Sequence, residues 1–165
     1  MIFLPALYSE DYGIPIISVG VIIFFAKIVD IISDPIMGLV NDVGFLKRKW
    51  WMFIGSIVCG ISLFCLFIPS FTPNVIYLGI FISLLYIGWT MFQVPYLSFG
   101  YDLEKDYFGR TRISATREFF ILMGLTSSVL LPVLFSVKQS EVIITYLALA
   151  SGFVSLTMFL LLLRE

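Results

Sequence analysis

The stretch that decides the fold runs from Ile14 to Lys49 and reads IPIISVGVIIFFAKIVDIISDPIMGLVNDVGFLKRK. Its part from Ile14 to Val40 is long and apolar enough to cross a bilayer, because a spanning helix needs roughly 20 predominantly apolar residues. A polar turn at 41–49 follows and ends in three consecutive basic residues. The stretch therefore predicts a membrane-spanning α-helix that leads into a basic loop.

Three charged residues interrupt this apolar helix: Lys27, Asp30 and Asp34. A charge at bilayer depth costs roughly 2.5–3.5 kcal/mol on insertion scales, so such residues usually face a protein interior or a water-filled cavity. The spacing of i, i+3 and i+7 keeps the three within roughly 60° of one another on a helix that turns about 100° per residue. We therefore expect a single polar stripe, with lipid on the other faces.

Pro35 follows the second carboxylate directly. Proline has no N–H, so the carbonyl of Ile31 loses its helical donor. A freed carbonyl between Asp30 and Asp34 makes a cluster of hard oxygen ligands, which suits Na⁺ or a proton. The alternative is structural: an internal ion pair between Lys27 and Asp30, with Asp34 paired elsewhere. That alternative gives the second carboxylate no role.

Composition supports a membrane protein. The hydrophobic fraction is 60% and the mean hydropathy is +1.05, whereas soluble domains are about 45–50% apolar. A net charge of −1 gives no indication of a nucleic-acid partner, and the lack of histidine removes His-based catalysis and His metal sites. The two cysteines, Cys59 and Cys65, lie six apart in one span and predict neither a disulfide nor a metal site. We expect no enzymatic activity and no cofactor other than a coupling cation.

The other apolar segments are expected to be helices too, because backbone polar groups in lipid must be paired. We predict an all-α integral membrane domain over 1–165, with one partial and five full spans at 1–8, 14–40, 50–69, 75–100, 119–137 and 142–163. Lysine and arginine gather in the loops 41–49 and 101–118, which lie on the same side. The positive-inside rule makes that side cytoplasmic, in a bacterial-type inner or plasma membrane.

Further candidate residues lie near the basic turn and in the fourth span. Gly38 permits close helix approach, and Asp42 and Arg48 belong to a cytoplasmic turn or gate, for which an ordinary basic loop is the alternative. Pro95 interrupts the fourth span, where Gln93 and Tyr96 suit an amphipathic small molecule. Hydrogen bonding of Gln93 between helices is the alternative there.

The loop 101–118 is the most charged part of the chain. Its mixed charges, among them Asp106, Arg110 and Arg112, predict a cytoplasmic network, against the alternative of a solvated loop. Arg117 stands where the next span begins, within reach of a cavity.

Several of these motifs together resemble a known family, the glycoside–pentoside–hexuronide:cation symporters of the major facilitator superfamily, of which melibiose permease is the type. The motif Asp30-x-x-x-Asp34-Pro35-Ile36-Met37-Gly38 is similar to the second helix of that family. Further similarity lies in Val94-Pro95-Tyr96 and in the run Asp106-Tyr107, Arg110-Thr111-Arg112 and Arg117-Glu118. The resemblance covers nearly the whole chain in order and implies the end of helix 1 plus helices 2–6 of a twelve-helix protein, with the C-terminal half missing.

The resemblance also assigns roles to residues. It implies that Asp30 and Asp34 bind the cation, with a hydroxyl from Thr90, and that Lys27 is a basic residue near that site. Arg117 matches an arginine near the sugar. Gln93 stands where melibiose permease has a sugar-binding aspartate, a departure that removes a charge from the substrate site.

These observations favour cation-coupled symport of a sugar or related small organic solute by alternating access. The alternatives are symport of a lysolipid or other amphipathic solute, and a truncated remnant that does not transport. An intramembrane aspartyl protease is disfavoured, because both membrane aspartates share one helix and the Gly-x-Gly-Asp element is absent.

Overall fold

The computed structural model describes residues 4–44, 47–69, 72–103, 106–134 and 137–162, and these residues are helical wherever they form regular structure. The helices, in chain order, are α1 (Leu4–Glu10), α2 (Ile16–Val43), α3 (Arg48–Phe67), α4 (Val75–Leu103), α5 (Tyr107–Leu134) and α6 (Val137–Leu162). The prediction of an all-α fold is therefore confirmed.

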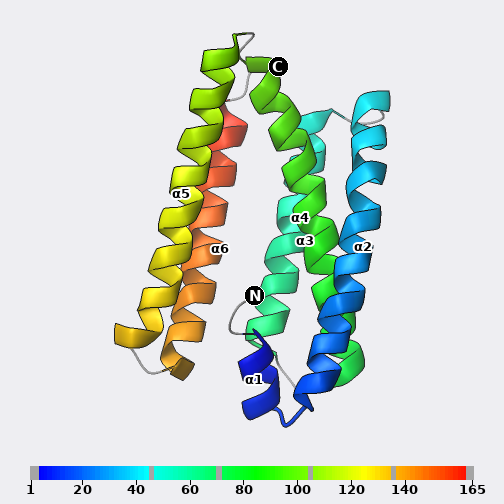
Figure 1. Cartoon of the computed structure of the whole chain (residues 1–165), viewed down its shortest axis with the longest axis vertical. Helices are drawn as coiled ribbons and strands as arrows, with labels where there is room; N and C mark the ends of the chain where they lie inside the picture. Colours follow the sequence, from blue (N-terminus) through cyan, green and yellow to red (C-terminus); the bar gives the residue numbers. More distant parts are fainter. Residues whose placement is uncertain (1–3, 45–46, 70–71, 104–105, 135–136, 163–165) are drawn as a thin grey trace.

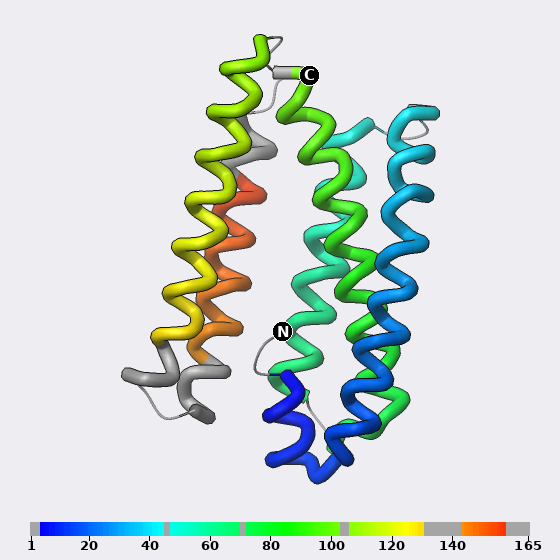
Figure 2. The backbone as a smooth tube through the Cα atoms, in the orientation of Figure 1, coloured from blue at the N-terminus to red at the C-terminus, as the bar shows by residue number. Residues whose placement is uncertain are grey.

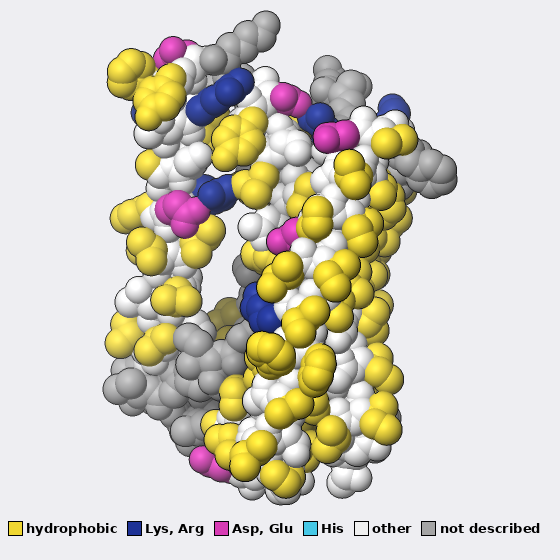
Figure 3. Space-filling view, turned by 45° about the vertical axis from the view of Figure 1, so that its right-hand side comes forward, with side chains coloured by type: hydrophobic (Ala, Val, Ile, Leu, Met, Phe, Trp, Pro, Cys, Tyr) yellow, Lys and Arg dark blue, Asp and Glu magenta, His cyan; other side chains and the backbone are white. Residues whose placement is uncertain are grey.

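Within the part of the chain that the structure describes, four helices are long and apolar enough to cross a membrane: Ile16–Val43, Arg48–Phe67, Val75–Asp102 and Tyr107–Leu130. In α6 the described apolar part, Ile143–Thr157, is shorter. Large apolar side chains cover the outer surface of the molecule (Figure 3). Such a surface suits a lipid environment, since soluble monomers rarely expose contiguous apolar patches of that extent.

The helices form two groups, which Figures 1 and 2 show side by side. In the first group α4 packs against both α2 and α3, and α1 packs against the start of α2. In the second group α5 lies beside α6, and α6 joins the groups by packing on α3. The direct contact between α4 and α5 is slight.

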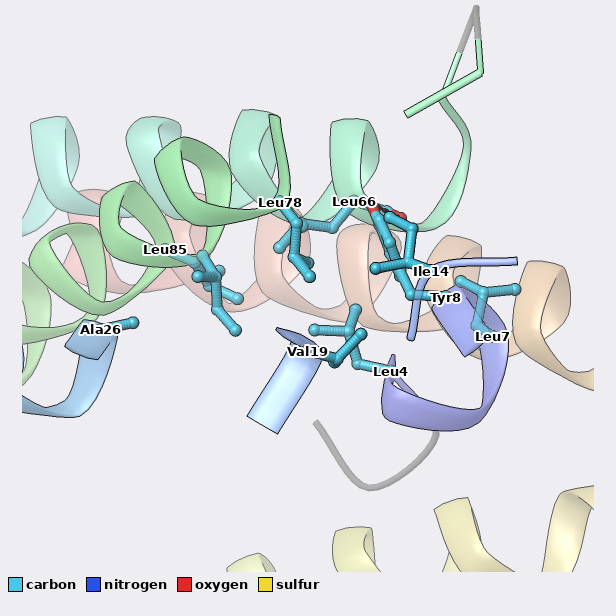
Figure 4. Close-up of a cluster of buried hydrophobic side chains, with 10 residues drawn as sticks. Leu4, Leu7, Tyr8, Ile14, Val19, Ala26, Leu66, Leu78 and Leu85 are labelled. Carbon is cyan, nitrogen blue, oxygen red and sulfur yellow. Dashed lines mark hydrogen bonds between the residues drawn. The ribbon is translucent and has the colours of Figure 1, made fainter. Parts of the chain in front are cut away.

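A compact apolar core lies where α1 meets the ends of the neighbouring helices (Figure 4). It includes Leu7 of α1, Val19 of α2, Leu66 of α3 and Leu78 of α4. The fully buried Tyr8 donates a hydrogen bond from its hydroxyl to the carbonyl of Leu66, at 3.0 Å. This bond satisfies the one polar atom of the ring, so the tyrosine can pack as an apolar residue.

Two predicted loops are wrong. The charged segment predicted as the loop 101–118 is helical from Tyr107 onward, because its polar side chains can point outward from a helix while the backbone stays hydrogen-bonded. The predicted loop 138–141 lies inside α6. The helix α2 runs through Pro35 to Val43, where Gly44 adopts a left-handed conformation with φ of 70° and ends the helix.

Gly38 does not mark a close helix contact, contrary to the prediction: a Cβ built there meets nothing within 4 Å. The close approach is between α3 and α4. A Cβ on Gly55 would lie 2.8 Å from the carbonyl oxygen of Gly88, and a Cβ on Gly88 would lie 2.8 Å from the backbone nitrogen of Cys59. Only glycine fits at both positions, and this contact sets the distance between α3 and α4.

Candidate functional site

The polar stripe of α2 faces α4 around one hydroxyl group. Thr90 of α4 is 1% exposed, and its Oγ1 lies 3.0 Å from Oδ1 of Asp34 and 3.3 Å from Oδ1 of Asp30. The same Oγ1 lies 3.1 Å from the carbonyl oxygen of Tyr86, one helical turn earlier. The structure thus brings together Asp30, Asp34 and Thr90, which we name the oxygen cluster.

The oxygen cluster has one hydroxyl hydrogen for two carboxylate oxygens. A threonine hydroxyl has one hydrogen, so Thr90 donates to one acceptor at a time. Two carboxylate oxygens lie near this hydroxyl. The carboxylate oxygen that does not receive the hydrogen lies close to the hydroxyl oxygen with no hydrogen between the two atoms, so they repel each other. A bound cation or an added proton would relieve this repulsion, because hard cations prefer carboxylate and other oxygen ligands.

Ser33 adds a second hydroxyl to the oxygen cluster. Its Oγ lies 3.0 Å from the carbonyl oxygen of Asp30 and 3.3 Å from Oγ1 of Thr90. Sequence reasoning missed Ser33, although its position three residues after Asp30 makes the two side chains neighbours on the helix surface. Among the described residues no group of three or more Asp, Glu, Cys or His side chains could hold a metal ion.

Lys27 pairs with the second oxygen of the Asp30 carboxylate. Its Nζ is 2.8 Å from Oδ2 of Asp30 and 4.3 Å from the centre of the Tyr86 ring. The ion pair considered as the structural alternative is therefore present, and Asp34 accepts a hydrogen bond from Thr90. The sequence also missed Tyr86, which stands one helical turn before Thr90.

The predicted substrate residues lie further along α4 and on α5. Gln93 is half-buried, and the ring of Tyr96 stacks with that of Phe92 at 5.8 Å between centroids and 12° between planes. Arg117 of α5 pairs with Glu118 at 2.6 Å, and its Nε is enclosed without a hydrogen-bond partner in the described structure. An enclosed, unsatisfied donor of this kind is available to a ligand oxygen.

Charged side chains of both signs stand beside an opening between α5 and the group of α2 and α4 (Figure 3). No contact recorded for the described residues joins Lys27 to Gln93, Tyr96 or Arg117. Lys27, which the resemblance places near the cation site and which we also predict among the substrate-binding residues, pairs with Asp30 of the oxygen cluster.

The basic end of the molecule is held by polar contacts between helices. Arg48 at the start of α3 pairs with Asp102 near the end of α4, and Nδ2 of Asn41 donates to Oγ of Ser98 at 3.3 Å, which ties α2 to α4. Asp42 is exposed in the last turn of α2. The other predicted residues of this end are exposed at or near the start of α5: Asp106, Arg110 and Arg112.

Comparison with known proteins agrees with the fold. The chain matches the family described as MFS/sugar transport protein over residues 1–164. It is 30% identical over 142 residues to "Inner membrane symporter YicJ" of Escherichia coli, covering 79% of this chain and 30% of that protein. It is 28% identical over 153 residues to "Uncharacterized symporter YjmB" of Bacillus subtilis, covering 86% of this chain and 33% of that protein.

A third relative, "Uncharacterized symporter sll1374" of Synechocystis, is 29% identical over 140 residues, which cover 76% of this chain and 25% of that protein. No solved structure matches the chain. The chain thus spans a quarter to a third of the length of these relatives. The matches confirm the predicted resemblance and, with the helices described above, an integral membrane protein with a partial major-facilitator fold.

Proposed function

This chain belongs to the MFS/sugar transport protein family, and on that premise we propose that it is part of a cation-coupled symporter for a sugar or a related small organic solute. The cation site is the oxygen cluster of Asp30, Asp34 and Thr90. One observation carries the proposal: two carboxylate oxygens share the single hydrogen of a buried hydroxyl. A monovalent cation or a proton between them removes that conflict.

Coupling follows from the placement of the two sets of residues on α4. Thr90 and Gln93 are three residues apart, so their side chains are neighbours on the helix surface. A cation that draws the stripe of α2 toward Thr90 fixes the face of α4 that also carries Gln93 and Tyr96. Cation and solute then raise each other's affinity, as linkage requires. The two halves of the complete transporter rock about this site.

The test is sodium binding to the purified 165-residue chain in lipid nanodiscs, measured with radioactive Na⁺ at constant ionic strength. Asp34→Asn keeps the size of the side chain but removes a charge, so affinity should fall at least roughly tenfold, about 1.4 kcal/mol. Asp42→Asn, with the same chemical change on the exposed last turn of α2, should leave affinity unchanged. Equal affinities for the wild type and Asp34→Asn would exclude this site.

The solute is the less specified part of the proposal. The stacked rings of Phe92 and Tyr96 offer a flat apolar face, and Gln93 and Arg117 offer hydrogen bonds. Such a face suits a sugar ring as well as the chain of a lysolipid. A panel of sugars and lysolipids, each tested for its ability to tighten Na⁺ binding to the chain, separates the two classes. No tightening by any solute would contradict coupling through α4.

We further propose that the basic end of the molecule, with Arg48, faces the cytoplasm of a bacterial-type membrane. The positive-inside rule supports this orientation. In a variant with both native cysteines replaced by alanine, Arg48→Cys should react with a membrane-impermeant maleimide only after the cells are opened. Thr72→Cys, at the opposite end of α3, should react in intact cells. Reaction of both from the same side would contradict the orientation.

A further inference from the structure

The two oxygens of the Asp30 carboxylate have different partners. Oδ1 faces the oxygen cluster, 3.3 Å from Thr90. Oδ2 accepts a hydrogen bond from Nζ of Lys27, at 2.8 Å. One carboxylate therefore connects a charge supplied by the protein to the place where the proposed cation binds.

The ammonium group of Lys27 is held from two directions. Besides Asp30, it lies 4.3 Å from the centre of the Tyr86 ring, within the roughly 6 Å over which a ring face attracts a cation. The carbonyl of the same Tyr86 is 3.1 Å from Oγ1 of Thr90. Tyr86 of α4 thus contacts both the lysine and the hydroxyl.

This arrangement sets the net charge of the site. Two carboxylates carry −2 and the ammonium carries +1, so Lys27, Asp30 and Asp34 together carry −1. One monovalent cation brings this total to zero. A divalent cation would bring it to +1 in a membrane interior, where an unbalanced charge is expensive.

We propose that Lys27 is a tethered cation that determines which ions the site accepts: by occupying one carboxylate oxygen and one unit of charge, it limits the site to a single monovalent ion. The proposal rests on the proposed function, because it assumes that Asp30 and Asp34 bind the coupling ion. It gives Lys27 a part in ion specificity and not in solute binding.

Repulsion by the ammonium discriminates between ions by their charge. The Coulomb energy between Lys27 and a bound ion doubles when the charge of that ion doubles. Removing the ammonium should therefore favour a divalent ion more than a monovalent one. It also frees Oδ2 of Asp30, and divalent ions such as Ca²⁺ take six or more oxygen ligands, including carboxylates in bidentate contact.

The experiment measures displacement of radioactive Na⁺ by Ca²⁺ from the 165-residue chain in nanodiscs. In the wild type, Asp34-dependent Na⁺ binding should saturate at one ion per chain and resist Ca²⁺. In Lys27→Gln, Ca²⁺ should displace Na⁺ at concentrations at least roughly tenfold lower than in the wild type. Lys27→Arg keeps the charge and should behave as the wild type does. Lys47→Gln, the same change at an exposed position before α3, should have no effect.

A double variant tests the charge count itself. Lys27→Gln with Asp30→Asn returns the net charge to −1, so the advantage gained by Ca²⁺ should disappear although Na⁺ binds more weakly. Circular dichroism and a monodisperse elution profile establish that each variant is folded.

The outcomes separate the two proposals. Na⁺ binding that depends on Asp34, combined with unchanged Ca²⁺ displacement in Lys27→Gln, would overturn the role of Lys27 alone. Absence of Asp34-dependent binding in the wild type would overturn the proposed site and this inference with it. If Lys27→Gln does not fold, the wild type still decides: displacement of Na⁺ by Ca²⁺ at equal concentration, or two Na⁺ ions per chain, would overturn the inference.

Discussion

The helix α4 has two sides that are built differently. Toward α2 and α3 it is closely packed: Gly55 and Gly88 bring two backbones together, and the buried Thr90 meets the stripe of α2. Toward α5 it makes slight contact. Every described side chain of α5 is exposed or half-exposed, and Arg117 there has an enclosed Nε without a partner in the described structure.

This difference separates the two parts of the candidate site. The proposed cation side is preformed, since its oxygens are already within hydrogen-bond distance of one another. On the proposed solute side, Gln93 and Tyr96 on α4 and Arg117 on α5 are not joined by contacts in the described structure. We infer that the cation site forms within this chain, whereas the solute site needs a bound solute or a further part of the transporter to close it.

The largest expected effect is on the packed side. In Gly55→Ala the new Cβ would lie 2.8 Å from both the Gly88 oxygen and the Phe92 nitrogen. Backbone atoms cannot move aside as a flexible side chain does, so α3 and α4 must separate. We expect a loss of stability of about 3 kcal/mol or more, at the upper end of overpacking costs, and a strong fall in folded yield after detergent extraction.

The matched control is Gly124→Ala on α5, where the Cβ meets nothing within 4 Å. There the change should be neutral or should stabilise the helix by about 0.5–1 kcal/mol, the usual gain of alanine over glycine. Unfolding in increasing sodium dodecyl sulfate, followed by circular dichroism, measures both variants. Equal behaviour of the two would show that the sides of α4 are packed alike.

Much of the packed side could be predicted from the sequence. Charges at i, i+3 and i+7 in an apolar run define one stripe whatever the helix packs against, so Lys27, Asp30 and Asp34 were identified from spacing alone. Thr90 came only from the resemblance, because a threonine in an apolar helix has no local signal that distinguishes it. The helices were predictable since lipid requires paired backbone groups.

The rest depends on which helix faces which. Tyr86 and Ser33 join the site only because α2 and α4 are adjacent in a particular register. Gly55 and Gly88 look like ordinary glycines until their helices are placed side by side. The many charged residues of 101–118 predict a loop, but a helix with exposed polar side chains has the same composition. The start of α5 at Tyr107 therefore could not be predicted from charge.

The next effect in size concerns the oxygen cluster. Thr90→Val replaces the hydroxyl by a methyl group of similar size, so it removes the shared hydrogen and one oxygen ligand while keeping the volume. We expect Na⁺ affinity in the nanodisc assay to fall by roughly tenfold, because the loss of one contact to a charged group costs a free energy of about that size. Thr90→Ser keeps the hydroxyl and should retain most of the affinity.

Thr126→Val on α5 is the control for this change, because the exposed Thr126 hydroxyl donates to the carbonyl of Leu122 in its own helix, at 2.8 Å. It should leave Na⁺ affinity as it is. Reduced affinity in Thr126→Val, or undiminished affinity in Thr90→Val, would mean that the cation site is not preformed between α2 and α4.

The smallest expected effect is at the charged end of α4, where ion pairs on the two sides should contribute equally little to stability. The side chains of Arg48 and Asp102 are 35% and 65% exposed, so water screens their ion pair and each can be solvated without the other. Such pairs contribute about 0–1 kcal/mol. Asp102→Asn should therefore change the free energy of unfolding by no more than about 1 kcal/mol.

The same limit should hold for Glu118→Gln on α5, which breaks the pair with Arg117. Both values come from the detergent titration used for the glycine variants, at low and high salt. A loss above about 2 kcal/mol in Asp102→Asn that salt does not reduce would exceed the range for a solvated pair. It would show that the packed side of α4 continues to its end.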